Sequence, residues 1–197
     1  MKLPIKKLII GTAFLMLTNA FAGPFGLNQG DSADTLAKKG NFKPSEEPYT
    51  YIARSLTNGH SGFDLYSVVV TPQQGLCKIN ALGKDIVTSV YGSELTSAFN
   101  RLEQQLSEKY GKAKRYDFLR QGSIWKEPED WTMSLLKKER TLSSFWGEKN
   151  QLADSLMSIS LEAKSLSNSK GYLLLSYEFN NFDDCWKVLS KKESANL

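Results

Sequence analysis

Apolar residues recur every three or four positions between residues 91 and 111. The stripe consists of Leu95, Phe99, Leu102, Leu106 and Tyr110. This spacing places all five side chains on one side of a helix with about 3.6 residues per turn. Ser93 is suited to be the N-cap, and Gly111 can take the left-handed conformation that ends a helix. We therefore predict that residues Tyr91–Gly111 form a long helix that packs on the core.

Strand patterns occur on both sides of this predicted helix. The clearest lies at residues 157–164, where Met157, Ile159, Leu161 and Ala163 alternate with polar residues. Further strands are predicted at residues 25–27, 49–57, 63–71, 76–82, 85–90, 113–119, 141–146 and 171–179. Short helices are predicted at residues 32–39, from Pro128 onward and at residues 183–192.

Hairpins interspersed with helices favour an α+β fold over a regular alternation of strands and helices. The segment Asn58-Gly59 between two strand patterns is typical of a hairpin turn. We therefore expect a mainly antiparallel sheet, packed by one long central helix and by shorter helices.

The first 22 residues have the pattern of a secretory signal peptide. Lys2, Lys6 and Lys7 precede a short apolar run at residues 8–17, and Ala20-Phe21-Ala22 fits the small-x-small cleavage rule. Cleavage between Ala22 and Gly23 would leave residues 23–197 as a single mature domain. The apolar run is shorter than the roughly 20 residues of a transmembrane helix. The sequence thus predicts a periplasmic or secreted protein without a transmembrane segment in its mature chain.

The charge balance of the mature chain differs from that of the whole sequence. The sequence has 25 Lys and Arg residues against 21 Asp and Glu residues, and three of the lysines lie in the signal segment. Without that segment the chain is close to neutral and has no basic block. This argues against binding to nucleic acid or to an anionic lipid surface.

The chain has two cysteines, Cys77 and Cys185, and one histidine, His60. In an exported protein, two cysteines are expected to form a disulfide. Reactive thiols or a metal site are the alternative, but the chain has no Cys-x-x-Cys motif. We expect no bound metal and no cofactor, because the sequence contains neither a metal-ligand cluster nor a phosphate-binding glycine loop.

Three acidic residues, Glu127, Glu129 and Asp130, lie between Trp125 and Trp131. Carboxylates framed by tryptophans are typical of a sugar-binding cleft, and glycoside hydrolysis needs two carboxylates. The alternative is structural, since acidic residues are favoured at the start of a helix.

Other matches to catalytic motifs lack their expected context. His60 lies in a predicted hairpin turn, where a Ser-His-Asp set rarely converges. Ser134-x-x-Lys137 and Ser167-x-x-Lys170 match the serine–lysine pair of penicillin-recognising enzymes, but the companion motifs are missing.

The second half of the chain is rich in aromatic residues. Trp125, Trp131 and Trp146 are the tryptophans of its central part. Exposed aromatics would supply a surface for a ligand or for another protein, whereas buried ones would belong to the core.

The segment Phe25-Gly26-Leu27-x-x-Gly30 behind a signal peptide resembles small exported Gram-negative proteins that begin with F-G-L-x-x-G. The Gly30-Asp31-Ser32 turn into a helix is similar to β-lactamase-inhibitor-like and SmpA/OmlA-type domains. That resemblance implies a two-layer α/β module that binds other proteins. The chain lacks the lipid-anchor cysteine of the OmlA type, so the resemblance does not extend to outer-membrane tethering.

Three functional hypotheses follow from the sequence. The first is a non-enzymatic exported protein that binds another envelope or extracellular protein. The second is a hydrolase acting on the cell envelope, with Glu127, Glu129 or Asp130 as acids or bases. The third is a module that binds a small apolar or sugar ligand between its sheet and its helices.

Overall fold

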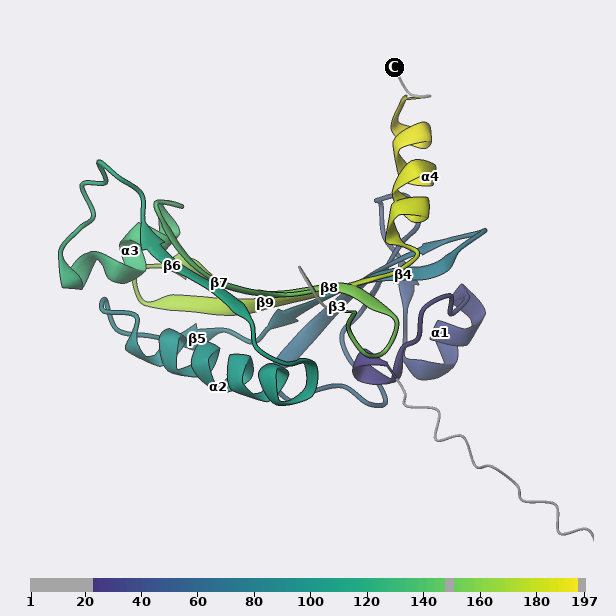
Figure 1. The fold of residues 1–197 in the computed structure, drawn as a ribbon, viewed down its shortest axis with the longest axis horizontal. Coiled ribbons are helices and arrows are strands. Elements are labelled where there is room, and N and C mark those ends of the chain that lie inside the picture. The colour runs from purple at the N-terminus through teal and green to yellow at the C-terminus, as the bar shows by residue number, and fades with distance from the viewer. Residues whose placement is uncertain (1–22, 148–150, 195–197) are drawn as a thin grey trace, which may run out of the picture.

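The computed structural model of the chain describes residues 23–147 and 151–194. The predicted signal segment lies outside these residues. In the described residues, nine strands form one antiparallel sheet in the order β1-β2-β3-β4-β9-β8-β7-β6, and β5 pairs with β9 (Figure 1). The strands are β1 (Lys43–Pro44), β2 (Thr50–Ala53), β3 (Phe63–Thr71), β4 (Gly75–Gly83), β5 (Ile86–Val87), β6 (Lys114–Leu119), β7 (Arg140–Trp146), β8 (Leu156–Ser167) and β9 (Lys170–Phe179).

The described part of the chain also has four α-helices and two 3-10 helices beside the sheet. They are η1 (Pro24–Gly26), α1 (Ala33–Lys39), α2 (Ser93–Tyr110), η2 (Pro128–Asp130), α3 (Trp131–Leu136) and α4 (Phe182–Ser194). Helix α2 is the longest of them and corresponds to the predicted central helix. The predicted α+β class with a mainly antiparallel sheet is confirmed. Within the described residues, no helix is both long enough and apolar enough to cross a membrane.

Helix α2 lies along one face of the sheet (Figure 1). Its apolar stripe packs there, with Leu95 and Phe99 fully buried and Leu106 nearly so. The sheet meets it with alternate residues of each strand, such as Leu173, Leu175 and Tyr177 in β9, while the residues between them are only half-buried. The alternation follows from the strand geometry, in which successive side chains point to opposite faces.

The pairing of β4 with β9 joins the two halves of the chain into one sheet. Ile79 lies opposite Tyr177, and Ala81 lies opposite Leu175. The N-terminal strands and the C-terminal hairpin therefore share one core under α2. This pairing brings residues that precede α2 in the sequence next to residues that follow it.

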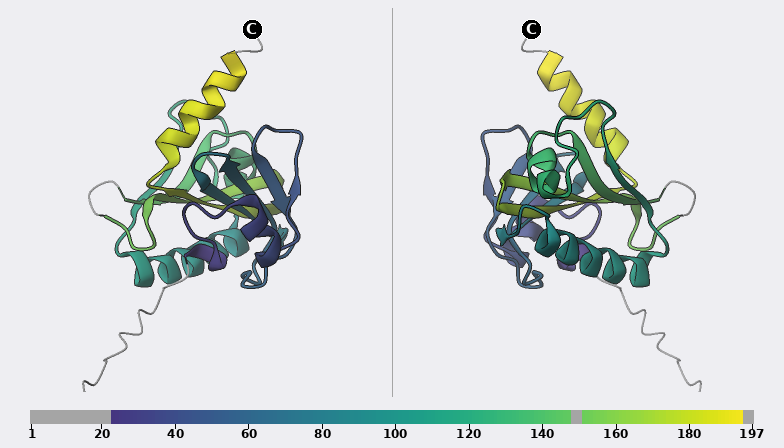
Figure 2. Two further views of the ribbon diagram at one scale, coloured as in Figure 1. Left: turned by 90° about the vertical axis from the view of Figure 1, so that its right-hand side faces the viewer. Right: turned by 90° about the vertical axis from the view of Figure 1, so that its left-hand side faces the viewer.

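Helix α4 stands away from the body at one end of the sheet (Figures 1 and 2). A disulfide ties its first turn to the sheet, because Cys185 is bonded to Cys77 of β4 with their Cα atoms 6.6 Å apart. The predicted pairing of the two cysteines is thus present in the structure.

Two local predictions were wrong. Residues 25–27 do not form an edge strand, because Pro24–Gly26 is a 3-10 helix that places the Phe25 ring edge-on against the rings of Tyr66 and Tyr177. Ser93 is also not the N-cap of α2. Gly92 takes that position with a φ of 69°, and Thr88 Oγ1 accepts the hydrogen bond from the Leu95 N–H instead.

Candidate functional site

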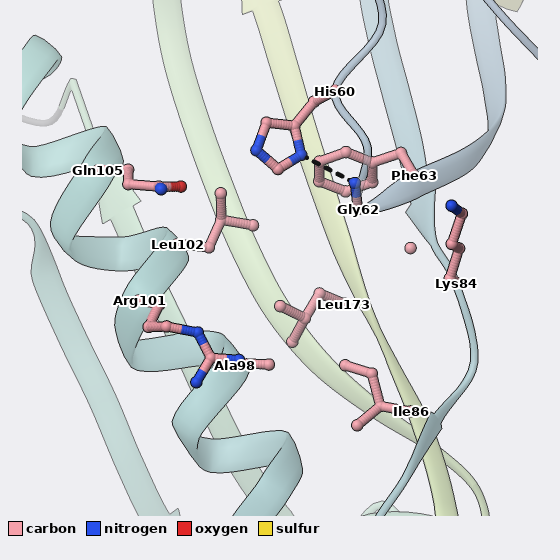
Figure 3. A pocket seen from close by; sticks show the side chains of 11 residues that line it. His60, Gly62, Phe63, Lys84, Ile86, Ala98, Arg101, Leu102, Gln105 and Leu173 are labelled. Carbon is pink, nitrogen blue, oxygen red and sulfur yellow. Dashed lines mark hydrogen bonds between the residues drawn. The ribbon is translucent and has the colours of Figure 1, made fainter.

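A hollow of about 310 Å³ lies between α2 and the strands beside it, and we call it the α2 groove (Figure 3). Its floor is made by the side chains of Phe63, Ile86, Ala98, Leu102 and Leu173. Its rim carries His60, Lys84, Arg101 and Gln105. Segments far apart in the sequence thus meet at one site: the turn before β3, the loop after β4, helix α2 and strand β9.

The apolar floor follows from the same periodicities that build the fold. Ala98 and Leu102 are one helical turn apart, so they share one side of α2. Leu173 belongs to the buried face of β9. Phe63 is buried but out of phase with the later buried alternation of β3, because the pairing with β4 shifts between Phe63 and Leu65. Leu102 is one of the predicted stripe residues, but it is only partly buried. In the groove, side chains between α2 and the sheet such as Ile86, Ala98 and Leu102 stay partly exposed to solvent.

The rim of the groove carries two cationic side chains that form no ion pair with the described residues, Lys84 and Arg101. Figure 3 shows Arg101 reaching in from α2 on one side and Lys84 standing on the opposite side. By contrast, Lys109 at the far end of the helix is neutralised by Asp154, 2.7 Å away. Unbalanced positive charge is therefore concentrated at one end of the groove.

His60 is held at the rim by hydrogen bonds within its own turn. The Gly62 N–H donates to His60 Nδ1 at 3.1 Å, drawn as a dashed line in Figure 3. In the neutral ring the proton is then on Nε2, which can donate to a ligand. The His60 backbone N–H donates to the hydroxyl of Tyr66, and this hydroxyl donates to the His60 carbonyl. Burial raises the pKa of Tyr66, so its phenol stays neutral.

A second hollow, of about 190 Å³, continues the groove toward the C-terminal end of α2. It shares His60, Phe63, Leu102 and Gln105 with the first. Its inner end is formed by Tyr110 and Tyr177, and burial raises the pKa of both phenols far above the usual value. Tyr110 donates its hydroxyl hydrogen to Asp154 at 2.9 Å. This end is therefore aromatic, and Lys109, which also lines it, is paired with Asp154.

Together the two hollows form a channel with an apolar floor, Lys84 and Arg101 at one end, and aromatic rings beside the ion-paired Lys109 at the other. The hydrogen-bond donors His60 and Gln105 lie where the two hollows meet. Among the described residues that line it there is no serine, threonine, cysteine or carboxylate. The lining can hold an apolar body by burial and an anionic group by charge. No cluster of metal ligands is found in the described part of the chain.

The predicted acidic candidates lie elsewhere. Glu127 and Glu129 are exposed at the start of η2, and Asp130 Oδ2 accepts a hydrogen bond from the Glu127 N–H at 3.3 Å. This is the arrangement expected at a helix N-terminus. The structure does not bring these three carboxylates to the α2 groove.

The three tryptophans proposed for binding do not share a surface. Trp146 is buried, with 3% of its surface exposed, and its Nε1–H donates to the Gly111 carbonyl at 2.8 Å. Trp131 is half-buried against Gly92 and carries the Arg140 guanidinium over its ring. Trp125 is also half-buried. A binding role for Trp125 and Trp131 stays a prediction.

Sequence reasoning missed Lys84, Arg101 and Gln105. Arg101 flanks the apolar stripe of α2 without belonging to it, and Gln105 lies one turn further along. Lys84 follows a strand end and has no motif around it. No signal in the sequence indicates that these residues face one another, because their meeting depends on the pairing of β4 with β9.

No protein-family model, curated protein or solved structure matches this chain. The site must therefore be interpreted from its own geometry.

Proposed function

We propose that the protein is a binding protein for a small amphiphilic anion, held in the α2 groove with its charged group at Lys84 and Arg101. One observation carries this proposal: an apolar hollow whose rim holds two cations without a carboxylate partner among the described residues. Buried apolar surface supplies the affinity for the body of such a ligand, at about 25 cal/mol per Å². The cations select the sign of its head group.

The charges and the shape of the groove together determine how the ligand is oriented in it. Arg101 can hold a carboxylate with two parallel N–H donors, and Lys84 adds a second positive charge from the other side. The opposite end offers the uncharged rings of Tyr110 and Tyr177. An anionic head at Arg101 and an apolar tail toward Tyr177 match both ends.

The size of the site limits the ligand. A volume of about 310 Å³ is near the lower end of typical ligand pockets, and the second hollow lengthens the site without widening it greatly. A single alkyl chain or one aromatic ring system bearing a carboxylate fits these limits. A two-chain lipid is too large.

Export is the setting that we propose for this activity. The N-terminal pattern favours secretion, and the Cys77–Cys185 disulfide suits an oxidising compartment such as the periplasm. A role in binding another envelope protein, which the sequence favoured first, stays a prediction. The groove supports the small-ligand hypothesis more directly because its chemistry specifies an occupant.

The experiment is isothermal titration calorimetry of the purified protein with three probes of equal chain length: decanoate, decanol and decyltrimethylammonium. We expect decanoate to bind most tightly, decanol more weakly and the ammonium compound least. Arg101→Ala and Lys84→Ala should each weaken decanoate binding about tenfold to a hundredfold, since a hydrogen bond to a charged group contributes about 1.5–3 kcal/mol. They should leave decanol binding nearly unchanged.

Lys126→Ala is the matched control, because Lys126 is an exposed cation that does not line the groove. Equal binding of decanoate and decanol by the wild-type protein would overturn the proposed role of the two cations. The absence of heat with all three probes would overturn the proposed function.

A further inference from the structure

Strand β6 forms one edge of the sheet. Within the described residues it pairs only with β7, so its outer side presents backbone N–H and C=O groups without strand partners (Figure 1). It is six residues long, whereas β1 at the opposite edge has only two. A long open edge can pair with another strand, and proteins protect such edges or use them.

The register of β6 and β7 fixes which residues face outward. The Arg120 N–H donates to the Glu139 carbonyl at 2.7 Å, directly beyond the pair Leu119–Arg140. Hydrogen-bonded and non-hydrogen-bonded pairs alternate along an antiparallel ladder. The even-numbered residues of β6 therefore bond to β7. The backbone groups of Arg115, Asp117 and Leu119 point outward.

We propose that β6 pairs antiparallel with β6 of a second copy of this chain, with Tyr116 on the two-fold axis. In this register Arg115 lies opposite Asp117 of the second copy, and Asp117 lies opposite its Arg115. The backbone N–H and C=O groups of both residues point to the open edge, so the two residues form hydrogen-bonded pairs across the axis. The sheets of the two copies become one continuous sheet.

The charges on this edge are complementary to themselves in that register. Arg115 and Asp117 lie on the same face of the strand, with Arg115 Nη2 and Asp117 Oδ2 3.6 Å apart. Because the two copies are related by a two-fold axis, Arg115 of each copy faces Asp117 of the other across the interface. Charged residues on an edge normally discourage pairing. Here Arg115 and Asp117 disfavour pairing with strands of other sequence but favour pairing with a second copy, whose charges are complementary.

The other face of β6 supplies apolar surface for the same contact. Phe118 is 52% exposed, and Tyr116 packs edge-on against Phe145 at 5.8 Å between ring centres. In the dimer the two Tyr116 rings lie side by side at the axis. Phe118 is covered by the beginning of the second copy's β6. Aromatic cross-strand neighbours of this kind stabilise a sheet.

The first test is sedimentation velocity of the wild-type protein and two charge variants over a series of concentrations. We expect a dimer for the wild type. Arg115→Glu and Asp117→Arg each place like charges across the axis and should raise the dissociation constant about tenfold or more, because both halves of the interface are affected. A 1:1 mixture of the two variants should form a heterodimer, because every cross-axis pair is then opposite in charge.

A wild-type protein that remains monomeric over the whole series overturns the proposal. Variants that dimerise as well as the wild type overturn the register. Circular dichroism melting curves establish that each variant is folded, which matters because Arg115 also bonds to Glu103 and Asn100.

Disulfide trapping tests the register without charge changes. Tyr116→Cys places two thiols at a non-hydrogen-bonded pair, where Cα atoms are about 4.5 Å apart and a disulfide can form. Phe118→Cys is the matched control, since the two copies of that residue are about 13 Å apart in this register. We expect a covalent dimer under mild oxidation for Tyr116→Cys and not for Phe118→Cys. Equal trapping of both, or trapping of neither, contradicts the proposed pairing.

The groove and the edge can be tested separately. None of the described residues lining the α2 groove belongs to β6. Loss of dimerisation should therefore leave decanoate binding unchanged, and failure of one proposal does not imply failure of the other.

Discussion

The hydroxyl of Tyr66 both accepts from the backbone N–H of His60, at 3.1 Å, and donates to the carbonyl of His60, at 3.3 Å. A fully buried residue of β3 thereby fixes the turn that carries one rim of the α2 groove. The position of the rim is set from inside the core.

Tyr66→Phe removes both hydrogen bonds and keeps the ring. We expect the free energy of unfolding to fall by about 1–2 kcal/mol, because the variant loses two partly buried hydrogen bonds. Decanoate affinity should fall several-fold, since His60 and Phe63 are no longer held in place. Chemical denaturation and calorimetry measure the two effects. Tyr116→Phe, which leaves the groove untouched, is the control, and unchanged affinity in Tyr66→Phe would contradict this role of the turn.

Gly92 and Gly111 flank α2, and both have positive φ angles, 69° and 85°. A Cβ at Gly92 would lie 1.9 Å from an atom of the Trp131 ring, whereas a Cβ at Gly111 would meet nothing within 4 Å. Gly111→Ala should therefore lower stability by about 1 kcal/mol through backbone strain alone. Gly92→Ala should lower it by at least about 2 kcal/mol, because ring displacement adds to the strain. Thermal melting compares them, and equal losses would contradict the close packing of Trp131.

The disulfide encloses a long segment, since Cys77 and Cys185 are 108 positions apart. Its loss should lower the free energy of unfolding by about 4–5 kcal/mol in the chain-entropy account. Denaturation of the double variant Cys77→Ala/Cys185→Ala, and of the wild type with and without reductant, measures this loss. Reductant should have no effect on the double variant. A wild-type protein whose stability is insensitive to reduction would refute the bond.

Glu94 gives the stability of α2 a dependence on pH. Hydrogen bonds from the Ser89 N–H and the Thr88 hydroxyl hold the pKa of this carboxylate below its usual value of 4.5. A lowered folded-state pKa means that the ionised form stabilises the fold above the unfolded pKa. This contribution is lost as the pH falls through the folded pKa.

Glu94→Gln should therefore be less stable than the wild type above about pH 5, and the difference should shrink as the solution becomes more acidic. Urea denaturation of both proteins between neutral pH and pH 3 follows this difference. Glu108→Gln, on the same helix, should show no comparable loss. A Glu94→Gln difference that stays constant down to pH 3 would contradict the assignment.

The sequence predicted the elements of the fold better than their arrangement. The stripe from Leu95 to Tyr110 predicted a helix and the alternation from Met157 to Ala163 predicted a strand. Both predictions were possible because each pattern lies within one short segment of the chain. The order of the strands is not local. Nothing near Ile79 or Tyr177 indicates that these residues lie opposite each other, and this pairing decides which loops flank α2.

The candidate site shows the same limit. Leu102 was recognised as a core-facing residue, but its partial exposure depends on how far the turn at His60 lies from the helix. Arg101 resembled any solvated cation of an amphipathic helix. Its importance here comes from the lack of a carboxylate partner in the described structure, which only the assembled fold reveals. Glu127 and Trp125, in contrast, formed a suggestive local pattern that the fold places away from the groove.

The most direct test of the ligand-binding account is a titration of isotope-labelled protein with decanoate, followed by NMR. We predict that the largest shifts occur at the backbone amides of Ala98, Arg101 and Leu102, and at the side-chain amide of Gln105. Amides on the opposite face of the sheet, such as those of Ser160 and Ser176, should stay unchanged. Shifts centred on that opposite face, or no shifts when decanoate is in excess, would contradict the assignment of the α2 groove as the binding site.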